Sequence, residues 1–261
     1  MNPASRLPAC CRLVSYDTIG STSDEAKRLA RAGAPAWTVV WAREQTAGRG
    51  RRGRPWVSPR GNLYVSLVLR PACPPDHAAR LGFAAALAVG DALADLVPGL
   101  TGLSCKWPND VLLDGGKVAG LLLESEVGQA AETAAEPGNA ENFAFLVVGI
   151  GINLAAAPAG TEFPATSLAA ARHAPPEPAV MLESLLRNFV IWEQRWREEG
   201  FAPIRAAWLE RAAGRGEAIR VRLEHATLHG TFADLDEGGS LVLRAVDGLR
   251  RIAAGDVFPA G

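Results

Sequence analysis

The stretch "WTVVWAREQTAGRGRRGRPWVSPRGNLYVSLVL", residues 37–69, decides the fold class. It opens with a β-branched and aromatic run, passes through a loop rich in glycine and arginine, and closes with the alternating strand pattern of 62–69. The loop contains a literal G-x-G-x-x-G at Gly48, Gly50 and Gly53. A dinucleotide-binding fingerprint needs a helix directly after these glycines, because the helix N-terminus holds the pyrophosphate. A strand follows instead, so we exclude that fold, and also the P-loop, whose Gly-Lys-Ser/Thr ending is absent.

The remaining hydrophobic patterns predict an α/β (α+β) protein with a mixed sheet. We expect helices at 21–32, 77–97, 178–199 and 201–213, and strands at 37–42, 62–69, 103–107, 111–113, 117–125 and 143–154. Thr22 stands three residues before Glu25, which is the spacing of a capping box for the first helix. A hairpin turn is expected at 114–116, and the small, acidic segment 128–142 is predicted to be a flexible hairpin loop.

The end of the chain differs in character from the part before it. From Ala218 onward the residues alternate with period two and are interrupted by Gly-rich turns, which predicts a small all-β barrel. We therefore divide the chain into two domains, residues 1–214 and 215–261.

Composition excludes several function classes. The 261 residues are 48% hydrophobic and carry a formal net charge of -1, so the chain has no general attraction for nucleic acid or anionic lipid. Its four cysteines, Cys10, Cys11, Cys73 and Cys105, have neither zinc nor redox C-x-x-C spacing. No apolar run reaches the roughly 18 residues of a membrane span, and no signal-peptide profile opens the chain. We expect a cytoplasmic protein.

The loop in the opening stretch concentrates positive charge. Arg49, Arg51, Arg52 and Arg54 lie within six residues and repel one another unless an anion sits among them. A nucleotide or its acyl derivative would supply that anion. A solvated basic loop, or a nucleic-acid patch in which Trp56 stacks on bases, fits the loop taken alone equally well.

A second segment, "KWPNDVLLDGGKVAGLLLES" at 106–125, adds two further cations. Lys106 ends a strand beside a Pro-Asn-Asp turn, Lys117 follows a short hairpin, and Gly120 permits a close approach. The alternative reading is structural, with Lys106 extending its stem along apolar surface and Trp107 packed in the core.

Read together, these segments resemble the biotin protein ligases, which attach biotin to a lysine of carboxylase carrier domains. The resemblance extends from about residue 14 to residue 258. It rests on these collinear stretches: "GSTSDEA" at 20–26, "EQTAGRGRRGRPWVSPRGNLYVS" at 44–66, "KWPNDVLLDGGKVAGLLLE" at 106–124, "VVGIGINL" at 147–154, "ATSL" at 165–168, "FAPIRAAWLERAAGRGEAIRV" at 201–221 and "GDVF" at 255–258.

The resemblance implies a catalytic domain at 1–214, an SH3-like barrel at 215–261 and a two-step reaction. Biotin would attack MgATP to give biotinyl-5′-AMP and pyrophosphate, and a lysine of a biotin carboxyl carrier protein would then take the biotin. The substrates implied are biotin, ATP and Mg²⁺. Only about twenty residues precede Ser21, too few for the DNA-binding domain of two-function relatives, so we expect a monofunctional ligase that binds neither DNA nor membrane. An edge strand could support a homodimer, but the sequence identifies no contact and leaves monomer and dimer open.

The resemblance also implies roles for individual residues. Arg51 and Lys106 are the expected catalytic residues, beside the acyl phosphate and the biotinyl carbonyl. The expected biotin- and nucleotide-binding residues are Ser21, Thr22, Ser23, Gln45, Gly48, Arg49, Gly50, Arg54, Trp56, Asn109, Lys117, Gly120 and Asn153. Ser23 departs from the family, which usually has Asn there, and Asn109 has a competing structural reading as the residue that holds its own turn. No resident metal ligands are predicted.

Two rival functions remain. Lipoate protein ligases activate a different acyl group by the same chemistry, but they lack the G-R-G-R-R-G signature. A nucleic-acid-binding module built on the arginine loop and the barrel conflicts with the neutral net charge and with acidic barrel residues such as Glu224 and Asp234.

Overall fold

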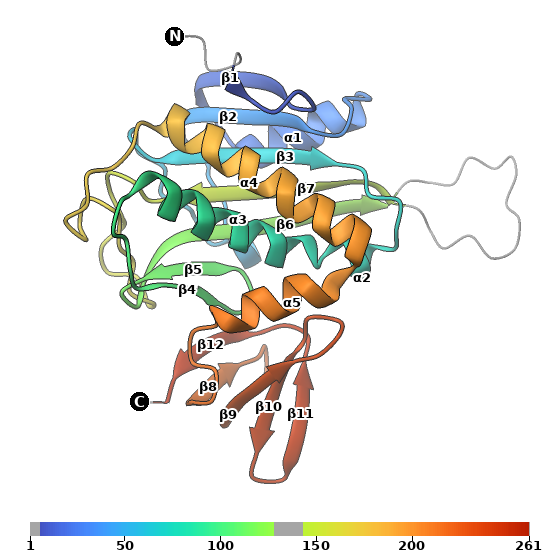
Figure 1. Cartoon of the computed structure of the whole chain (residues 1–261), viewed down its shortest axis with the longest axis vertical. Helices are drawn as coiled ribbons and strands as arrows, with labels where there is room; N and C mark the ends of the chain where they lie inside the picture. Colours follow the sequence, from blue (N-terminus) through green and yellow to red (C-terminus); the bar gives the residue numbers. More distant parts are fainter. Residues whose placement is uncertain (1–5, 128–142, 261) are drawn as a thin grey trace, which may run out of the picture.

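The computed structural model describes residues 6–127 and 143–260, and its main feature is a seven-stranded mixed sheet (Figure 1). The strands lie in the order β1-β2-β3-β7-β6-β5-β4. β1 pairs with β2 in parallel, and every other neighbouring pair is antiparallel. The strands are β1 (Arg12–Ile19), β2 (Thr38–Gln45), β3 (Leu63–Leu69), β4 (Leu103–Lys106), β5 (Asp110–Leu113), β6 (Gly116–Val127) and β7 (Phe143–Ile152).

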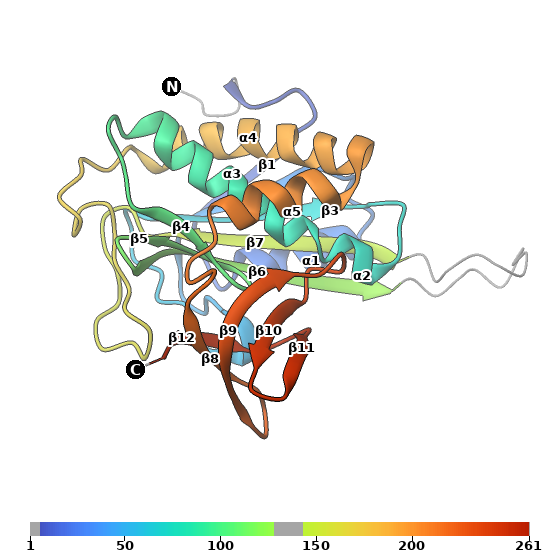
Figure 2. The same ribbon diagram turned by 60° about the horizontal axis from the view of Figure 1, so that its bottom comes forward.

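Helices cover both faces of this sheet. They are α1 (Thr22–Arg31), α2 (Pro75–Ala78), α3 (Leu81–Leu96), α4 (Pro178–Glu199) and α5 (Phe201–Glu210). Helices α3 and α4 lie across one face and α1 lies on the other (Figures 1 and 2). Successive strand residues point to opposite faces, so Val39 and Trp41 of β2 join the large core while Val40 packs with Ala26 and Ala30 of α1. β-Branched and aromatic residues on both sides make β2 a central strand.

A second, antiparallel sheet follows the helices. Its order is β11-β10-β9-β8-β12, and its strands are β8 (Ala218–Arg222), β9 (Thr227–Leu235), β10 (Leu241–Ala245), β11 (Gly248–Ile252) and β12 (Asp256–Pro259). The core of this sheet continues into that of the main sheet, since Trp107 Nε1 donates to Gly239 O at 3.0 Å. Gly239 has φ +85°, and a Cβ there would lie 2.7 Å from the Phe83 ring. The contact therefore needs glycine.

The fold class agrees with the sequence prediction, and so does the tight hairpin. At that hairpin β5 passes into β6 through Asp114 and Gly115, both with positive φ. The segment 128–142, predicted to be a flexible loop, lies outside the described residues. Across the described ranges, no helix is long and apolar enough to span a membrane.

Three local predictions differ from the structure, and one strand was missed. The N-cap of α1 is Ser21, whose Oγ accepts from the Asp24 amide at 3.4 Å, so the predicted capping box beginning at Thr22 is one residue out of place. The predicted helix 77–97 is divided into α2 and α3, and the helix predicted at 201–213 ends at Glu210. Strand β1 was not predicted, because its half-exposed residues give a weak hydrophobic signal.

Candidate active site

A cavity of about 290 Å³ lies between the arginine loop, the main sheet and the C-terminal sheet. Segments far apart in the chain meet here: the start of α1, the loop after β2, the β4–β5–β6 corner, a connection near residue 160, and β12. All the residues predicted to act on the substrates line this cavity except Gly48. The two motifs that were ambiguous when read separately therefore share one site.

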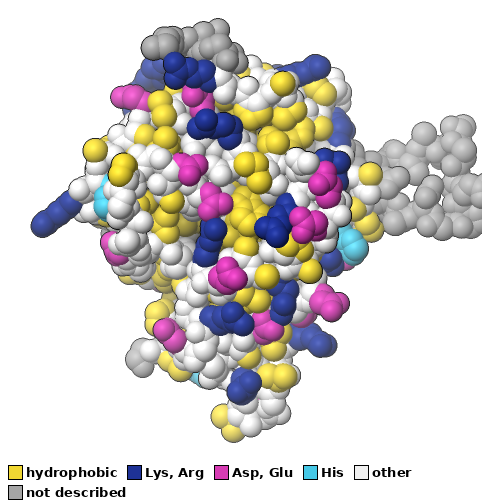
Figure 3. Space-filling model, viewed as in Figure 1, with side chains coloured by type: hydrophobic (Ala, Val, Ile, Leu, Met, Phe, Trp, Pro, Cys, Tyr) yellow, Lys and Arg dark blue, Asp and Glu magenta, His cyan; other side chains and the backbone are white. Residues whose placement is uncertain are grey.

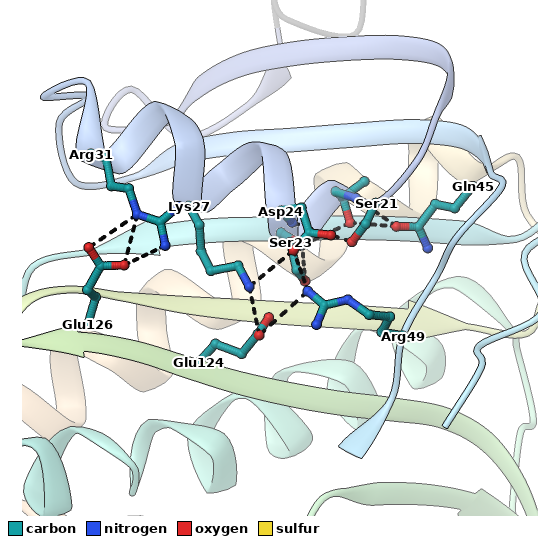
Figure 4. Close-up of polar contacts among 11 residues, drawn as sticks. Ser21, Ser23, Asp24, Lys27, Arg31, Gln45, Arg49, Glu124 and Glu126 are labelled. Atoms are coloured by element: carbon teal, nitrogen blue, oxygen red, sulfur yellow. Dashed lines mark hydrogen bonds and ion pairs between the residues drawn. The ribbon is translucent and has the colours of Figure 1, made fainter. Parts of the chain in front are cut away.

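One end of the cavity is neutral and rich in hydrogen-bonding groups. Ser21, Thr22 and Ser23 are buried at the first turn of α1, and Gln45 ends the adjacent strand β2. Gln45 Oε1 accepts from Thr22 N at 2.8 Å and from Thr22 Oγ1 at 3.0 Å. Figure 4 shows Ser21, Ser23 and Gln45 gathered where α1 begins. This end suits an uncharged polar group of a ligand.

The arginine loop is a hairpin held by its own backbone. Gly50 N donates to Arg54 O at 2.7 Å and Trp56 N donates to Gly48 O at 2.9 Å. A Cβ on Gly48 would lie 2.5 Å from Trp56 O, so Gly48 shapes the hairpin rather than the cavity wall. The prediction that Gly48 binds ligand finds no support from its position.

Arg49 pairs with different carboxylates from the other three arginines of the loop. Its guanidinium binds Asp24 on α1 and lies 3.6 Å from Glu124 Oε1 on β6, which also binds Lys27 (Figure 4). This charge cluster fastens the start of the loop to α1 and β6. Arg49 and Gly50 still border the cavity.

The other arginines converge on a carboxylate from the C-terminal sheet. Asp256 Oδ2 lies 2.7 Å from Arg54 Nη2 and 3.4 Å from Arg52 Nη1, and Asp256 Oδ1 lies 3.8 Å from Arg51 Nη1. Arg222 of β8 also contacts Asp256, at 3.3 Å. The sequence reasoning assigned Asp256 no role, although "GDVF" lay within the resemblance. The anion required among the clustered arginines is thus supplied, in this structure, from 200 residues further along the chain.

Hydrogen bonds and burial act in opposite directions on these groups. Burial disfavours the charged form of Asp256, but hydrogen bonds from Arg54 and Arg222, together with the charges of Arg54 and Arg52, hold the pKa of Asp256 below its usual range. Burial lowers the pKa of Arg51, and attraction to Asp256 opposes that change. Arg51 remains cationic because its ordinary pKa is so high.

The lysine corner brings two ammonium groups to one carboxylate. Lys117 Nζ lies 2.6 Å from Asp110 Oδ1, and Lys106 Nζ lies 3.6 Å from Asp110 Oδ2. The Lys106 ammonium lies 3.9 Å from the ring centre of Phe163 and 5.8 Å from the ring centre of Phe258 in β12. Burial lowers the pKa of Lys106, and the Asp110 charge limits that change. Asp110 and Phe258 lie within the quoted motifs but had no recognisable partner in the sequence, and Phe163 lies outside those motifs, so all three were missed.

Asn109 connects this corner to the arginine loop. Its Nδ2 donates to Leu121 O, which supports the structural reading of Asn109, and its Oδ1 also accepts from Arg51 Nη1 at 3.2 Å. The residue thus joins the turn between β4 and β5 to β6 and positions Arg51.

The floor of the cavity between these groups is flat. A Cβ on Gly151 or Gly120 would lie 2.5 Å or 2.8 Å from the indole of Trp56, so both glycines are needed for Trp56 to lie on β6 and β7. Asn153 is 1% exposed and donates to Thr166 O at 3.1 Å, but its Oδ1 receives no hydrogen bond from any described residue. A buried acceptor without a donor is costly, which makes Asn153 Oδ1 a site for a ligand N–H group.

The whole cavity is positive although the protein is nearly neutral. Five cationic side chains and three carboxylates line it, which leaves two positive charges in excess: Arg49, Arg51, Arg54, Lys106 and Lys117 against Asp110, Glu162 and Asp256. Such a site can hold two anionic reactants together and stabilise charge that develops between them. The described residues contain no group of three or more His, Cys, Asp or Glu side chains that could hold a metal ion.

Comparison with known proteins agrees with this geometry. Residues 17–135 match the Biotin/lipoate A/B protein ligase family, and residues 215–258 match the Biotin protein ligase C terminal domain. A biotin--[acetyl-CoA-carboxylase] ligase of Paracoccus denitrificans is 45% identical over 92% of this chain and 98% of its own length. The corresponding ligase of Mycobacterium tuberculosis is 36% identical, covering 92% and 87%. A biotin protein ligase from Aquifex aeolicus, solved in complex with biotin and ATP, aligns with TM-score 0.76 and 26% identity over 95% of this chain and 97% of its own.

The fold and the cavity thus define a member of the biotin/lipoate protein ligase family. Within that class, the extent of the matches and the C-terminal sheet decide between its branches: this chain belongs to the biotin protein ligase family.

Proposed function

We propose that this protein is an ATP-dependent biotin–carrier protein ligase that makes biotinyl-5′-AMP and transfers the biotin to a lysine of a carrier domain. The observation that carries the proposal is the cavity itself, in which a neutral, hydrogen-bonding end adjoins a cluster of fixed cations. A neutral ring with an anionic carboxylate tail fits across those two environments. The relatives named as biotin--[acetyl-CoA-carboxylase] ligases support a carboxylase carrier as the second substrate.

In this proposal the catalysis is electrostatic. A carboxylate oxygen of biotin attacks the α-phosphorus, the bond from that phosphorus to the α,β-bridging oxygen breaks, and pyrophosphate leaves with that oxygen. Arg51 and Lys106 offset the repulsion between the two anions and stabilise the charge on the phosphoryl oxygens. Lys106 is suited to this role because its ammonium is buried and held by Asp110 and Phe163.

The nucleotide would lie towards Trp56 and Asn153. The unsatisfied Asn153 Oδ1 fits an N–H donor such as the adenine amino group, and the Trp56 indole, which lies on Gly120 and Gly151, offers a planar surface to an aromatic ring. Arg54 would meet the triphosphate, which arrives with Mg²⁺ as MgATP and takes over from Asp256 in neutralising the loop. For Ser21, Thr22, Ser23 and Gln45 we propose contacts with the neutral ring of biotin.

In the second step the amine of the carrier lysine attacks the acyl carbon of the mixed anhydride. An amide bond forms, the acyl–phosphate bond breaks, AMP leaves and the lysine loses a proton. Lys106 and Lys117 would stabilise the departing phosphate. Water is excluded by closure of the loop 48–58, which we propose to be mobile before the substrates bind.

Several broader features belong to the same proposal. We propose that residues 1–214 and 215–261 are separate domains, the second bringing Asp256 and Phe258 to the site. The four free cysteines support a cytoplasmic location. Basic and acidic side chains are interspersed over the face that carries α3 and α4 (Figure 3), as expected for a protein whose partner is a carrier domain rather than DNA. A homodimer through an edge strand, β1 or β4, remains a prediction.

The direct test is transfer to a carrier domain. The purified protein is incubated with MgATP, a biotin carboxyl carrier domain and either biotin or lipoate, and the carrier is analysed by mass spectrometry. We expect one biotinyl group on one lysine, and no addition when that lysine is replaced by arginine. Lipoylation without biotinylation would assign the chain to the lipoate branch, and no modification by either acid would refute the proposed function.

A further inference from the structure

The strongest unexplained feature is a chain of hydroxyl groups that runs inward from the neutral end of the cavity. Ser66 lies in the middle of β3, is fully buried, and was not among the predicted site residues. Its Oγ lies 2.9 Å from Thr22 Oγ1 and 3.0 Å from Ser23 Oγ. Ser66 thus joins two residues that line the cavity, although it does not line the cavity itself.

The direction of every hydrogen bond in this chain follows from one backbone group. Thr22 N–H can only donate, so the atom that it contacts in the Gln45 side chain is the oxygen. That oxygen can only accept, so the Thr22 hydroxyl donates its single proton to it. The other side of the Gln45 amide agrees, since Nε2 donates to Ser58 Oγ at 3.0 Å and Ser58 Oγ donates to Trp56 O at 2.8 Å.

The same reasoning extends to the two serines. Because the Thr22 proton is already used, Ser66 must donate to Thr22. Because a hydroxyl carries one proton, Ser23 must in turn donate to Ser66. All three protons are therefore used within the chain, and Thr22 and Ser23 present only lone pairs to the cavity.

The neighbouring groups have the opposite capacity. Ser21 Oγ accepts from the Asp24 amide at 3.4 Å and keeps its proton free, and Gln45 Nε2 has a second N–H beyond the one given to Ser58. The neutral end thus combines two groups that can only accept with two groups that can donate. A cyclic urea, with two ring N–H donors on either side of a carbonyl, is the complementary ligand.

We propose that Ser66 is a specificity-determining positioning residue, which fixes Ser23 and Thr22 as hydrogen-bond acceptors so that the site selects a ligand with two ring N–H donors. This inference rests on the proposed function, because biotin carries such a cyclic urea. It assigns the selection to a buried residue that touches no substrate. A ring oxygen placed where either N–H belongs would face a lone pair with no proton available to bind it.

The test compares Ser66→Ala with wild type by direct titration with biotin and with the two cyclic carbamate analogues, each having one ring N–H replaced by oxygen. We expect wild type to bind both analogues at least about 100-fold more weakly than biotin, because a site built around a ligand N–H rejects a ligand that lacks it. In Ser66→Ala the Ser23 proton is released and can turn towards the ligand. Biotin should then bind about 5- to 10-fold more weakly, as expected for one disordered hydrogen bond.

The decisive readout is selectivity between the analogues. Releasing Ser23 should recover the binding of one carbamate isomer, the one whose oxygen faces Ser23, by about 10-fold relative to biotin. The other isomer still faces Thr22, whose proton remains committed to Gln45. The KM for ATP should not change, because no member of the chain contacts the charged end.

The matched control is Ser184→Ala, which removes another fully buried serine hydroxyl, on α4 near Asp95 and outside the cavity. It should lower thermal stability about as much as Ser66→Ala. The affinity for each carbamate isomer relative to biotin should stay as in wild type. A Ser66→Ala variant that behaves like Ser184→Ala would overturn the inference, as would parallel recovery of both isomers. Wild type that binds biotin without activating it would refute only the proposed function, since the titration does not need ATP. Failure of wild type to bind biotin would overturn both.

Discussion

At one end of the cavity, a helix start and a strand end present the neutral side chains of Ser21, Thr22, Ser23 and Gln45. At the other end, arginines of the loop and lysines of the β4–β5–β6 corner meet carboxylates of that corner and of β12. The neutral end is ordered by short hydrogen bonds within one compact region of the chain. The charged end depends on contacts between segments about 200 residues apart, such as Arg54 with Asp256. The neutral end is therefore suited to recognition, and the charged end to neutralising reactants that enter and leave.

The largest effect should come from removing the buried ammonium at the charged end. Lys106→Ala should slow adenylate formation about 1,000-fold, the loss seen when one preorganised charge or donor is deleted from a dry site. The biotin dissociation constant should change little, because the neutral end is intact. Single-turnover formation of biotinyl-AMP measures the first quantity and calorimetry the second.

Lys27→Ala is the control for that experiment. Lys27 is also largely buried and paired with a carboxylate, Glu124, but it does not line the cavity. A comparable loss of rate in both variants would contradict a special role for Lys106.

A smaller effect is expected where the loop covers the intermediate. Arg51→Gly should release biotinyl-AMP about 10-fold faster or more, since the closed loop protects the anhydride. The free adenylate would then acylate bystander proteins, which a blot of added serum albumin detects. Arg52→Gly is a close control: Arg52 lies in the same turn, has φ 55° and does not line the cavity. Retention of the adenylate by Arg51→Gly as firmly as by wild type would argue against this role.

Ionic strength should affect binding at the charged end more than binding at the neutral end, without any mutation. Raising the ionic strength from about 0.05 M to about 0.5 M shortens the screening length several-fold and weakens attraction between partly exposed charges. We expect the KM for ATP to rise several-fold and the KM for biotin to rise less, because biotin carries a single negative charge and its ring binds at the neutral end. Steady-state pyrophosphate release, measured with one substrate varied at a time, checks both constants. Equal sensitivity of the two would remove the proposed distinction.

The smallest effect concerns folding stability. Asp256 has a pKa held below that of an unfolded chain, so its contribution is present above the unfolded value and is lost as the pH falls through the folded value. Because Arg54 is largely exposed, we expect Asp256→Asn to cost only about 0.5–1 kcal/mol at neutral pH. Urea unfolding at pH 7 and near pH 3 should show this difference shrinking in acid. Asp247→Asn is the control, because it removes the same charge from an exposed ion pair with Arg250, away from the arginine loop. A difference that persists in acid would show that the charge of Asp256 is not its cause.

Much of the fold could be predicted because its signals are local. The β-branched, aromatic and aliphatic residues in 37–42 and 62–69 reflect burial on both faces of β2 and β3. The Asp-Gly turn at 114–115 requires positive φ. Strand β1 could not be predicted in the same way, since an edge strand that is half exposed lacks a strong pattern. The α1 cap was misplaced by one residue because Ser21 and Thr22 are both good caps, and the pairing of Thr22 with Gln45 decides between them.

The site was predictable to the extent that its chemistry lies in motifs. Arginines and lysines clustered in two segments indicated anionic reactants, and both segments border the same cavity. Asp256, Asp110 and Ser66 were missed for a physical reason: each acts by pairing with a residue that the fold brings near, and a single Asp or Ser has no signal of its own. Which cation a carboxylate pairs with, and which way a hydroxyl proton points, can be read only when the positions of both partners are known.

The central claim is that one cavity holds a neutral-ringed carboxylic acid and a nucleotide triphosphate together until an acyl–AMP bond forms. Exchange of labelled pyrophosphate into ATP measures this step without the carrier. We predict exchange that requires biotin and Mg²⁺ and that is nearly abolished by Lys106→Ala. Exchange that proceeds equally without biotin, or no exchange by the intact protein at saturating biotin and MgATP, would contradict it.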